Sequence, residues 1–255
     1  MTVTGADAIG VPDSVLADLM LERLTTAYGA AADPGRAAAM RAAAADPGRA
    51  AAMRAYMKDV APFLGLPTPA RRALSRTVLA GTPRPDEADC TAIALRCWAL
   101  PQREYHYFAV DYLRRYAPRL SSAFLPVARR LVTTTSWWDT VDLLAAHVVG
   151  TLVEADPRFG ADMDVWIVDE DLWVARTALL HQLRYKERTD TDRLFGYCLR
   201  QSGHPDFFVR KAIGWSLREY AKTDPAAVRA FVARERGRFA PLTVREALKN
   251  IGDAP

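Results

Sequence analysis

Cysteine and histidine are scarce in this sequence, and their spacing excludes two kinds of site. The 255 residues include three cysteines, an odd number at wide spacing, which indicates reduced thiols and not a disulfide framework. The four histidines have no metal-ligand spacing with one another or with the cysteines. We therefore expect structural histidines and no metal site. The residues concerned are Cys90, Cys97, Cys198, His106, His147, His181 and His204.

Long apolar runs and cofactor motifs are also missing. No stretch approaches the roughly 18 apolar residues that span a bilayer, and the N-terminus carries no basic segment followed by an apolar run. The chain has no Walker loop, no dinucleotide fingerprint and no zinc-deaminase signature. These absences predict a cytoplasmic protein that has no export signal, no membrane association and no cofactor.

β-Strand patterns are absent as well, whereas helical patterns are frequent. No run with a period of two residues is bounded by hairpin turns, but apolar residues recur every three to four positions through most of the chain after Tyr56. Short breaks with Pro, Gly, Asp or Ser separate these segments. We therefore predict an all-α protein built from helices of about 12 to 17 residues. The predicted helices span residues 70–80, 87–99, 102–116, 121–133, 137–153, 167–183, 190–201, 205–221, 224–235 and 241–251.

The N-terminal region differs from the rest because a 13-residue sequence occurs twice in tandem. Residues 30–42 read AAADPGRAAAMRA, and residues 43–55 repeat these letters without a change. Alanine has the best helix propensity, so each copy can form a helix after its Asp-Pro-Gly break. We interpret the second copy as a recent, tolerated insertion and not as a special binding arm. The sequence thus divides into an N-terminal helical segment, 1–53, and a repeat domain, 54–255.

A short pattern recurs with a period in the mid-thirties. The sequence Arg-x-Ala-aliphatic begins at Arg176, Arg210 and Arg245, with separations of 34 and 35 residues. A valine precedes each arginine by one or two positions, and the same step back from Arg176 reaches Asp142, which also follows a valine. A repeat of this length made of two helices is typical of an α-solenoid. Because HEAT repeats are somewhat longer, at roughly 40–47 residues, we predict a HEAT-like helical-repeat superhelix.

Equivalent positions of a solenoid line one continuous concave face. The recurring residues are therefore expected on one mostly basic surface that contains a carboxylate, with two indoles at nearby positions. A net charge of +4 and a pI near 9.0 suit a polyanionic partner such as nucleic acid. The members of this predicted group are Asp142, Arg176, Arg210, Arg245, Trp138 and Trp215.

A carboxylate among phosphate-binding arginines repels nucleic acid, but it is useful if positive charge develops on the substrate. Cleavage of an N-glycosidic bond does this, because the sugar passes through an oxocarbenium-like state. A purine alkylated at N3 or N7 is already cationic and leaves without a general acid, so one carboxylate that stabilises the sugar and orients water is sufficient. The alternative is that the acid and the arginines form ion pairs between repeats while the tryptophans fill the core. An acid buried in such a pair and pointing away from any DNA-sized channel would contradict the enzyme interpretation.

Six stretches, in order along the chain, match a known family. They are 54–58 (RAYMK), 63–66 (FLGL), 68–72 (TPARR), 136–142 (SWWDTVD), 182–186 (QLRYK) and 211–223 (KAIGWSLREYAKT). Through them the chain resembles, over roughly residues 54–251, the AlkD family of bacterial alkylpurine DNA glycosylases.

The resemblance implies a HEAT-like fold whose concave face holds double-stranded DNA containing alkylated purines. It implies that Trp138 and Asp142 form the catalytic centre, that Arg176 lies near the lesion backbone, and that Trp215 and Trp138 flank the deoxyribose. It also implies that the damaged base is not inserted into a protein pocket, unlike in base-flipping glycosylases. Further DNA-backbone contacts are implied for Tyr56, Thr68, Arg72, Arg184 and Arg218.

The expected reaction is hydrolytic release of N3- or N7-alkylated purines, as the first step of base excision repair by a bacterial, monomeric enzyme. Strand cleavage is not expected, because the resemblance implies no lysine nucleophile. Two departures from the family pattern affect DNA contacts. Pro67 stands where the family often has Gln, which removes a hydrogen-bonding side chain and a backbone N–H. Arg184 replaces a common Lys, which keeps the charge and changes the phosphate geometry.

Three other functions remain open at this point. A non-catalytic HEAT-like paralogue would bind unusual DNA structures. A solenoid scaffold for protein partners would have apolar concave positions in place of the basic ones. A self-resistance glycosylase for bulky natural-product adducts would share every residue named here with a general repair enzyme.

Overall fold

The computed structural model describes residues 9–32 and 46–252, and these ranges contain helices and no strand. The all-α prediction is therefore confirmed for the described residues. Contacts along the chain divide it into two compact units, Met1–Thr135 (unit 1) and Ser136–Pro255 (unit 2). The sequence boundary after residue 53 stays a prediction, and it differs from the division that the contacts make.

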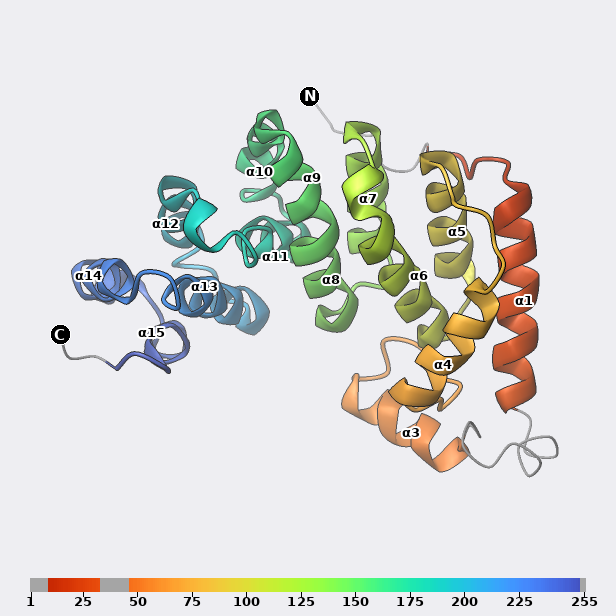
Figure 1. Cartoon of the computed structure of the whole chain (residues 1–255). Coiled ribbons are helices and arrows are strands. Elements are labelled where there is room, and N and C mark those ends of the chain that lie inside the picture. Colours follow the sequence, from red (N-terminus) through yellow and green to blue (C-terminus); the bar gives the residue numbers. More distant parts are fainter. Residues whose placement is uncertain (1–8, 33–45, 253–255) are drawn as a thin grey trace. The chain divides into compact units, whose positions relative to one another are not determined.

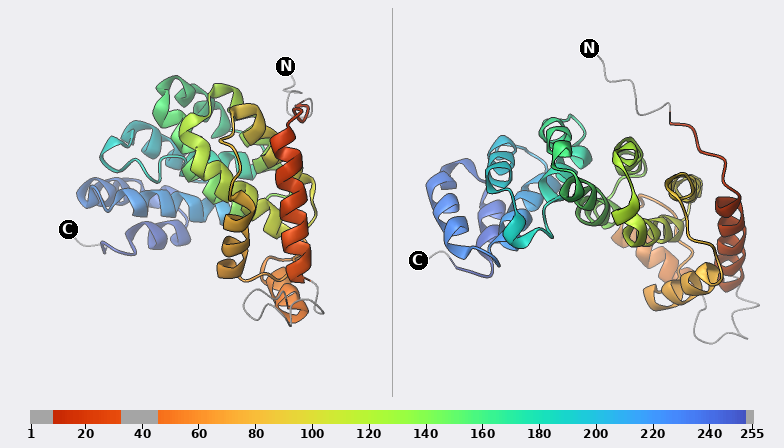
Figure 2. Two further views of the ribbon diagram at one scale, coloured as in Figure 1. Left: turned by 45° about the vertical axis from the view of Figure 1, so that its right-hand side comes forward. Right: turned by 45° about the horizontal axis from the view of Figure 1, so that its top comes forward.

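In unit 1, α1 packs against α4 and α5, and α5 packs in turn against α6. Figures 1 and 2 show α1, in red, beside α4 and α5. Leu24, Tyr28, Ile93, Phe108 and Leu113 are almost fully buried and form much of the core. The helices are α1 (Val15–Ala32), α3 (Pro47–Tyr56), α4 (Thr68–Leu79), α5 (Glu87–Ala99), α6 (Arg103–Tyr116) and α7 (Leu125–Thr133), with 3₁₀ turns η2 (Ala117–Arg119) and η3 (Ser122–Phe124) before α7.

The tandem repeat lies only partly within the described residues. Most of the first copy falls in 33–45, outside them, so its predicted helix stays a prediction there. The second copy forms α3, which begins after Asp46 because the Asp46 side chain accepts a hydrogen bond from the Gly48 amide. No residue of α3 is buried. The alanine-rich copy is thus helical by propensity and capping, with little packing of its own.

In unit 2, four helices lie in sequence, each beside the next: α8 contacts α11, α11 contacts α13, and α13 contacts α15. These are the helices that carry Asp142, Arg176, Arg210 and Arg245, so the mid-thirties period corresponds to neighbouring helices in space. The elements are α8 (Trp138–Leu144), η4 (Ala145–Val149), α9 (Gly150–Ala155), η5 (Pro157–Phe159), α10 (Gly160–Trp166), α11 (Leu172–Leu180), η6 (Lys186–Arg188), α12 (Thr191–Arg200), α13 (Phe207–Tyr220), α14 (Pro225–Glu235), η7 (Arg236–Arg238) and α15 (Pro241–Leu248).

Two glycines of unit 2, Gly150 in α9 and Gly214 in α13, permit close contacts between neighbouring segments. A Cβ on Gly150 would come within 2.2 Å of the His181 carbonyl oxygen, and a Cβ on Gly214 would come within 2.5 Å of the Glu246 Cβ. Real side chains do not tolerate such contacts, because interiors are close-packed. Gly214 therefore permits the close packing of α13 on α15.

Aspartates cap four of the α-helices in unit 2. The side chains of Asp171, Asp190, Asp206 and Asp224 each accept a hydrogen bond from a backbone amide in the first turn of the helix that follows. This is why breaks containing Asp or Pro located most helices from the sequence. The predicted helix 167–183 is wrong at its start, because α10 ends at Trp166 and α11 begins only at Leu172.

The described residues also bear on the predicted absences. Their three cysteines are free and buried. Within the described ranges, no group of His, Cys, Asp and Glu is arranged to hold a metal ion, and no helix there combines the length and apolar character of a membrane span.

Candidate functional site

Asp142 lies in α8 and belongs to an unusual helical segment. The N-cap of α8 is Trp137, and Trp138 and Asp142, four residues apart, occupy one face of its first turns. Directly after α8 the chain forms a π-helical turn, η4, before it continues as α9. Wide turns of this kind are rare, and they are frequent at functional sites. The structure thus places Trp138 and Asp142 one helical turn apart, as the spacing predicts, and adds a local irregularity one turn later.

Asp142 and Arg176 form a bidentate ion pair between α8 and α11. Arg176 donates from Nε to Oδ1 at 2.7 Å and from Nη2 to Oδ2 at 2.8 Å. Its third nitrogen, Nη1, donates to the carbonyl oxygen of Phe208 at the start of α13. The side chains of Arg176 and Asp142 are 3% and 9% exposed. One guanidinium therefore links three neighbouring helices.

This geometry corrects one expectation. Arg176 was expected on an exposed basic surface, where it would hold a phosphate, but all three of its guanidinium nitrogens are bonded within the protein. The ion pair between repeats, which was the alternative interpretation, is present. The role of Arg176 that fits these contacts is to orient Asp142, and direct phosphate binding stays a prediction.

The carboxylate of Asp142 keeps unused acceptor capacity. A carboxylate offers about four lone-pair positions, and Arg176 occupies two of them. Burial raises the pKa of Asp142, with a smaller contribution from the negative charge of Asp139, while the hydrogen bonds and charge of Arg176 act in the opposite direction. The Asp142 carboxylate is therefore held rigidly, in an environment where the charge on it is costly and is stabilised mainly by one partner.

An aromatic cluster, which we define as Trp137, Trp173 and Phe208, lies beside this pair. The ring centroids are 4.9 to 5.7 Å apart, and the Arg176 guanidinium carbon lies 6.0 Å from the centroid of the Phe208 ring. Sequence reasoning missed this cluster, because its members come from three different helices. A second tryptophan in the SWWDTVD stretch was the only available signal. These rings reduce the access of water to the pair and so strengthen its electrostatic interactions.

The remaining predicted residues of unit 2 vary in exposure and partners. Trp215 on α13 is half-buried, and Arg210, also half-buried, donates from Nε to the His204 carbonyl at 2.8 Å. Arg245 on α15 is exposed. Arg218 is paired with Glu246. Burial raises the pKa of Glu246, but the hydrogen bond from Arg218 and the positive charges of Arg218, Lys211 and Lys249 together outweigh burial and lower it.

Arg184 is exposed and lies against His147, its Nη1 bonded to the Nδ1 of that ring. The four positions of the repeat, 142, 176, 210 and 245, therefore do not form one uniformly exposed basic row: the first two are buried and paired, and exposure increases toward α15.

The three predicted residues of unit 1 are all exposed. Tyr56 ends α3, and Thr68 and Arg72 lie in the first turns of α4. Pro67 is the N-cap of α4 and provides no side-chain hydrogen bond. The first amides of α4 therefore have no side-chain cap from Pro67 and are suited to bind an anion.

The FLGL stretch before Pro67 is fixed by one buried acid. The Glu104 carboxylate accepts hydrogen bonds from the amides of Leu64, Gly65 and Leu66 at 2.8 to 3.2 Å. Gly65 has φ of +85°, in the left-handed region that favours glycine. This explains the sequence of the stretch and fixes the start of α4.

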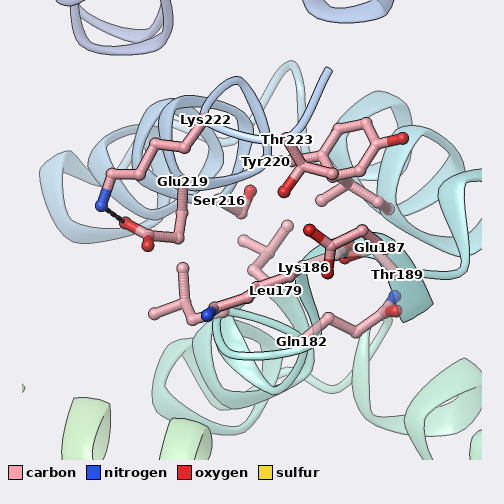
Figure 3. Close-up of a pocket in the computed structure, with 12 residues that line it drawn as sticks. Leu179, Gln182, Lys186, Glu187, Thr189, Ser216, Glu219, Tyr220, Lys222 and Thr223 are labelled. Carbon is pink, nitrogen blue, oxygen red and sulfur yellow. Dashed lines mark hydrogen bonds and ion pairs between the residues drawn. The ribbon is translucent and has the colours of Figure 1, made fainter. Parts of the chain in front are cut away.

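A pocket of about 260 Å³ in unit 2 lies between the C-terminal ends of α11 and α13 (Figure 3). Leu179, Lys186, Ser216 and Tyr220 are among its lining residues. None of Trp138, Asp142, Arg176 and Trp215 lines it. This pocket is thus separate from the predicted centre.

The chain is similar to a known protein family and to a solved structure. The profile of the family described as DNA alkylation repair enzyme matches residues 29–251. One solved structure, described as a predicted DNA alkylation repair enzyme from Enterococcus faecalis, is 31% identical to the chain, with a TM-score of 0.76. That match covers 82% of this chain and 98% of the other. No curated protein matches the chain.

Proposed function

Because this chain belongs to the DNA alkylation repair enzyme family, we propose that it is a DNA glycosylase of the AlkD type. It hydrolyses the N-glycosidic bond of N3- or N7-alkylated purines in double-stranded DNA, as the first step of base excision repair. We further propose that the helices form a HEAT-like superhelix with a concave DNA-binding face, and that the enzyme works as a cytoplasmic monomer without a cofactor.

One observation carries this proposal: Asp142 is a carboxylate held rigidly by Arg176, one helical turn from Trp138. A pre-oriented negative charge stabilises positive charge that develops in a transition state, because no reorganisation is needed when the bond breaks. In the proposed reaction the sugar becomes cationic as the base leaves. Asp142 stabilises that cation and positions the water, while Trp138 and Trp215 contact the sugar.

DNA contacts complete the proposal. The exposed residues Tyr56, Thr68, Arg72, Arg184 and Arg245 are available to bind the backbone, as are the partly exposed Arg210 and Arg218. Arginine forks match phosphate geometry. Binding should therefore weaken steeply as salt concentration rises.

The test is incubation with duplex DNA carrying 7-methylguanine, with detection of the released base by chromatography. We expect free 7-methylguanine and an intact strand that contains an abasic site. Salt-sensitive duplex binding without any released base would contradict the glycosylase proposal.

That second outcome corresponds to a specific alternative, a non-catalytic protein that binds DNA. The observation that favours it is the bidentate pairing of Asp142 with Arg176, which neutralises part of the charge that the reaction requires. The two functions differ in base release alone, so the same incubation distinguishes them.

A further inference from the structure

A group of positively charged side chains that is separate from the predicted DNA contacts lies in unit 1, in a pocket at the C-terminal end of α6. Arg84, Arg115 and Arg119 line this pocket together with Thr82 and Tyr116. All three arginines are exposed. No carboxylate is among the described residues that line it. Three like charges around one cavity repel one another, so an anion is the ligand that suits this pocket.

Among the residues that the structure describes, these arginines have no acidic partner, unlike their neighbours. Arg71, Arg96 and Arg114 of the same unit form ion pairs with Asp111, Asp18 and Asp111. Across the described part of the chain, Arg84, Arg115 and Arg119 form no ion pair.

A helix C-terminus stabilises nearby positive charge, and this accounts for Arg115 in the last turn of α6. It does not account for Arg84, which lies in the loop before α5.

The walls of the pocket are rigid. Pro83 and Pro118 line it, and proline fixes the backbone angle φ. The Arg115 guanidinium carbon lies 5.5 Å from the Tyr116 ring centroid, a cation–π contact that limits its motion. Binding of an anion here therefore requires little ordering of the loop or of this side chain.

The pocket is also far from the DNA contacts predicted in unit 1. Thr68 begins α4, whereas Thr82 follows the end of α4 at Leu79. At about 1.5 Å per residue, α4 separates these ends by about 17 Å. A ligand in this pocket is thus additional to any phosphate held at Thr68 and Arg72.

We propose that Arg84, Arg115 and Arg119 form a second anion site that binds the backbone phosphates of nucleic acid. Guanidinium forks suit phosphate oxygens, and the open pocket of about 560 Å³ admits a polymer backbone. The choice of nucleic acid over other polyanions rests on the proposed function. The site adds affinity along a duplex without taking part in base release.

The test compares the full chain with the variant R84Q/R115Q/R119Q. Binding of an undamaged 30-base-pair duplex is measured by fluorescence anisotropy over a range of salt concentrations. Each phosphate contact contributes about −0.9 to the slope of log K against log salt, so we expect the slope to become less steep by about 2 to 3. Affinity near 0.1 M salt should fall by at least about tenfold.

The matched control is R158Q/R234Q/R238Q, which removes the same charge from exposed positions in unit 2. It should retain more of the wild-type slope than the pocket variant. Circular dichroism shows whether both variants are folded.

Equal slopes for the two variants, or a wild-type slope for the pocket variant, would overturn the proposal. Calorimetry with inorganic pyrophosphate separates small phosphates from nucleic acid. Loss of pyrophosphate binding with an unchanged duplex slope would assign the pocket to a small phosphate compound and overturn the nucleic-acid inference. Undamaged DNA is used because its binding is measurable even if the glycosylase proposal fails.

Discussion

The guanidinium of Arg176 acts on Asp142 in two opposite ways. Its hydrogen bonds hold the carboxylate in one orientation and oppose the rise of its pKa, but its charge cancels part of the negative field that a sugar cation would meet. In the proposed reaction, catalysis by this pair therefore depends on rigid orientation and on the acceptor positions that Arg176 leaves unused.

Replacement of Arg176 by Gln should move the pH dependence of base release. Without Arg176, burial is the main influence left on Asp142, so its pKa rises and the acid limb of the rate profile moves to higher pH. Breaking a buried pair also costs about 3 to 5 kcal/mol of stability. Single-turnover release of 7-methylguanine between pH 4 and 8 measures the limb. R176K, which keeps the positive charge, serves for comparison. If the acid limb of the rate profile lay at the same pH in R176Q as in the wild type, the titration of Asp142 would not set that limb.

His181 is predicted to make the protein sensitive to mild acid. Burial lowers its pKa from 6.5 to about 4, while its Nδ1 contacts the Ala178 carbonyl at 2.7 Å. Between pH 6.5 and 4 the unfolded chain binds a proton at His181, whereas the folded chain does not. The contribution of neutral His181 to the free energy of unfolding is therefore fully present above pH 6.5 and is lost as pH falls toward 4. Its full size is on the order of 3 kcal/mol.

Urea unfolding at pH 7 and pH 4.5 measures this loss. His181→Gln should lose less stability between the two pH values than the wild type does. His204→Gln, at a half-exposed position, serves as the control. If H181Q and wild type lost equal stability, the pH sensitivity would have another origin.

At the scale of helices, Gly214 controls the packing of α13 on α15. An added Cβ would meet the Glu246 Cβ at 2.5 Å and the Thr243 carbonyl oxygen at 2.9 Å. Gly214→Ala should therefore lower the free energy of unfolding by about 1 to 3 kcal/mol. Gly196 in α12 has open space around the same position, so Gly196→Ala should raise stability by about 0.5 to 1 kcal/mol. Urea denaturation of both variants gives the comparison, and a stable G214A would contradict the account of this interface.

Helices were the most predictable elements of this chain. Asp-Pro breaks such as Asp224–Pro225 combine a capping side chain with a residue that favours the first turn, so the start of α14 could be placed within one residue. The π turn after α8 could not be predicted from the sequence, because the apolar spacing there also fits an ordinary α-helix. Helix α10 was missed because it is short and follows directly on the turn η5.

At the scale of the whole molecule, the period of 34 to 35 residues correctly identified which helices are neighbours. It could not predict side-chain burial, since equivalent positions differ in what packs over them. Asp142 and Arg176 are covered, whereas Arg245 is exposed. The aromatic cluster and the unpaired arginines of unit 1 depend on contacts between distant segments, and no local pattern records those contacts.

In the proposed reaction the charge of Asp142 drives base release, and Asp142→Asn tests this role most directly because size is kept and charge is removed. The control is Asp139→Asn, one turn of the same helix away. Single-turnover release of 7-methylguanine from duplex DNA is measured for both, after thermal unfolding confirms that they fold. D142N should release the base at least about 100-fold more slowly than the wild type, while D139N should stay within about threefold. Release by D142N within about threefold of wild type, less than about 1 kcal/mol of barrier, would contradict it.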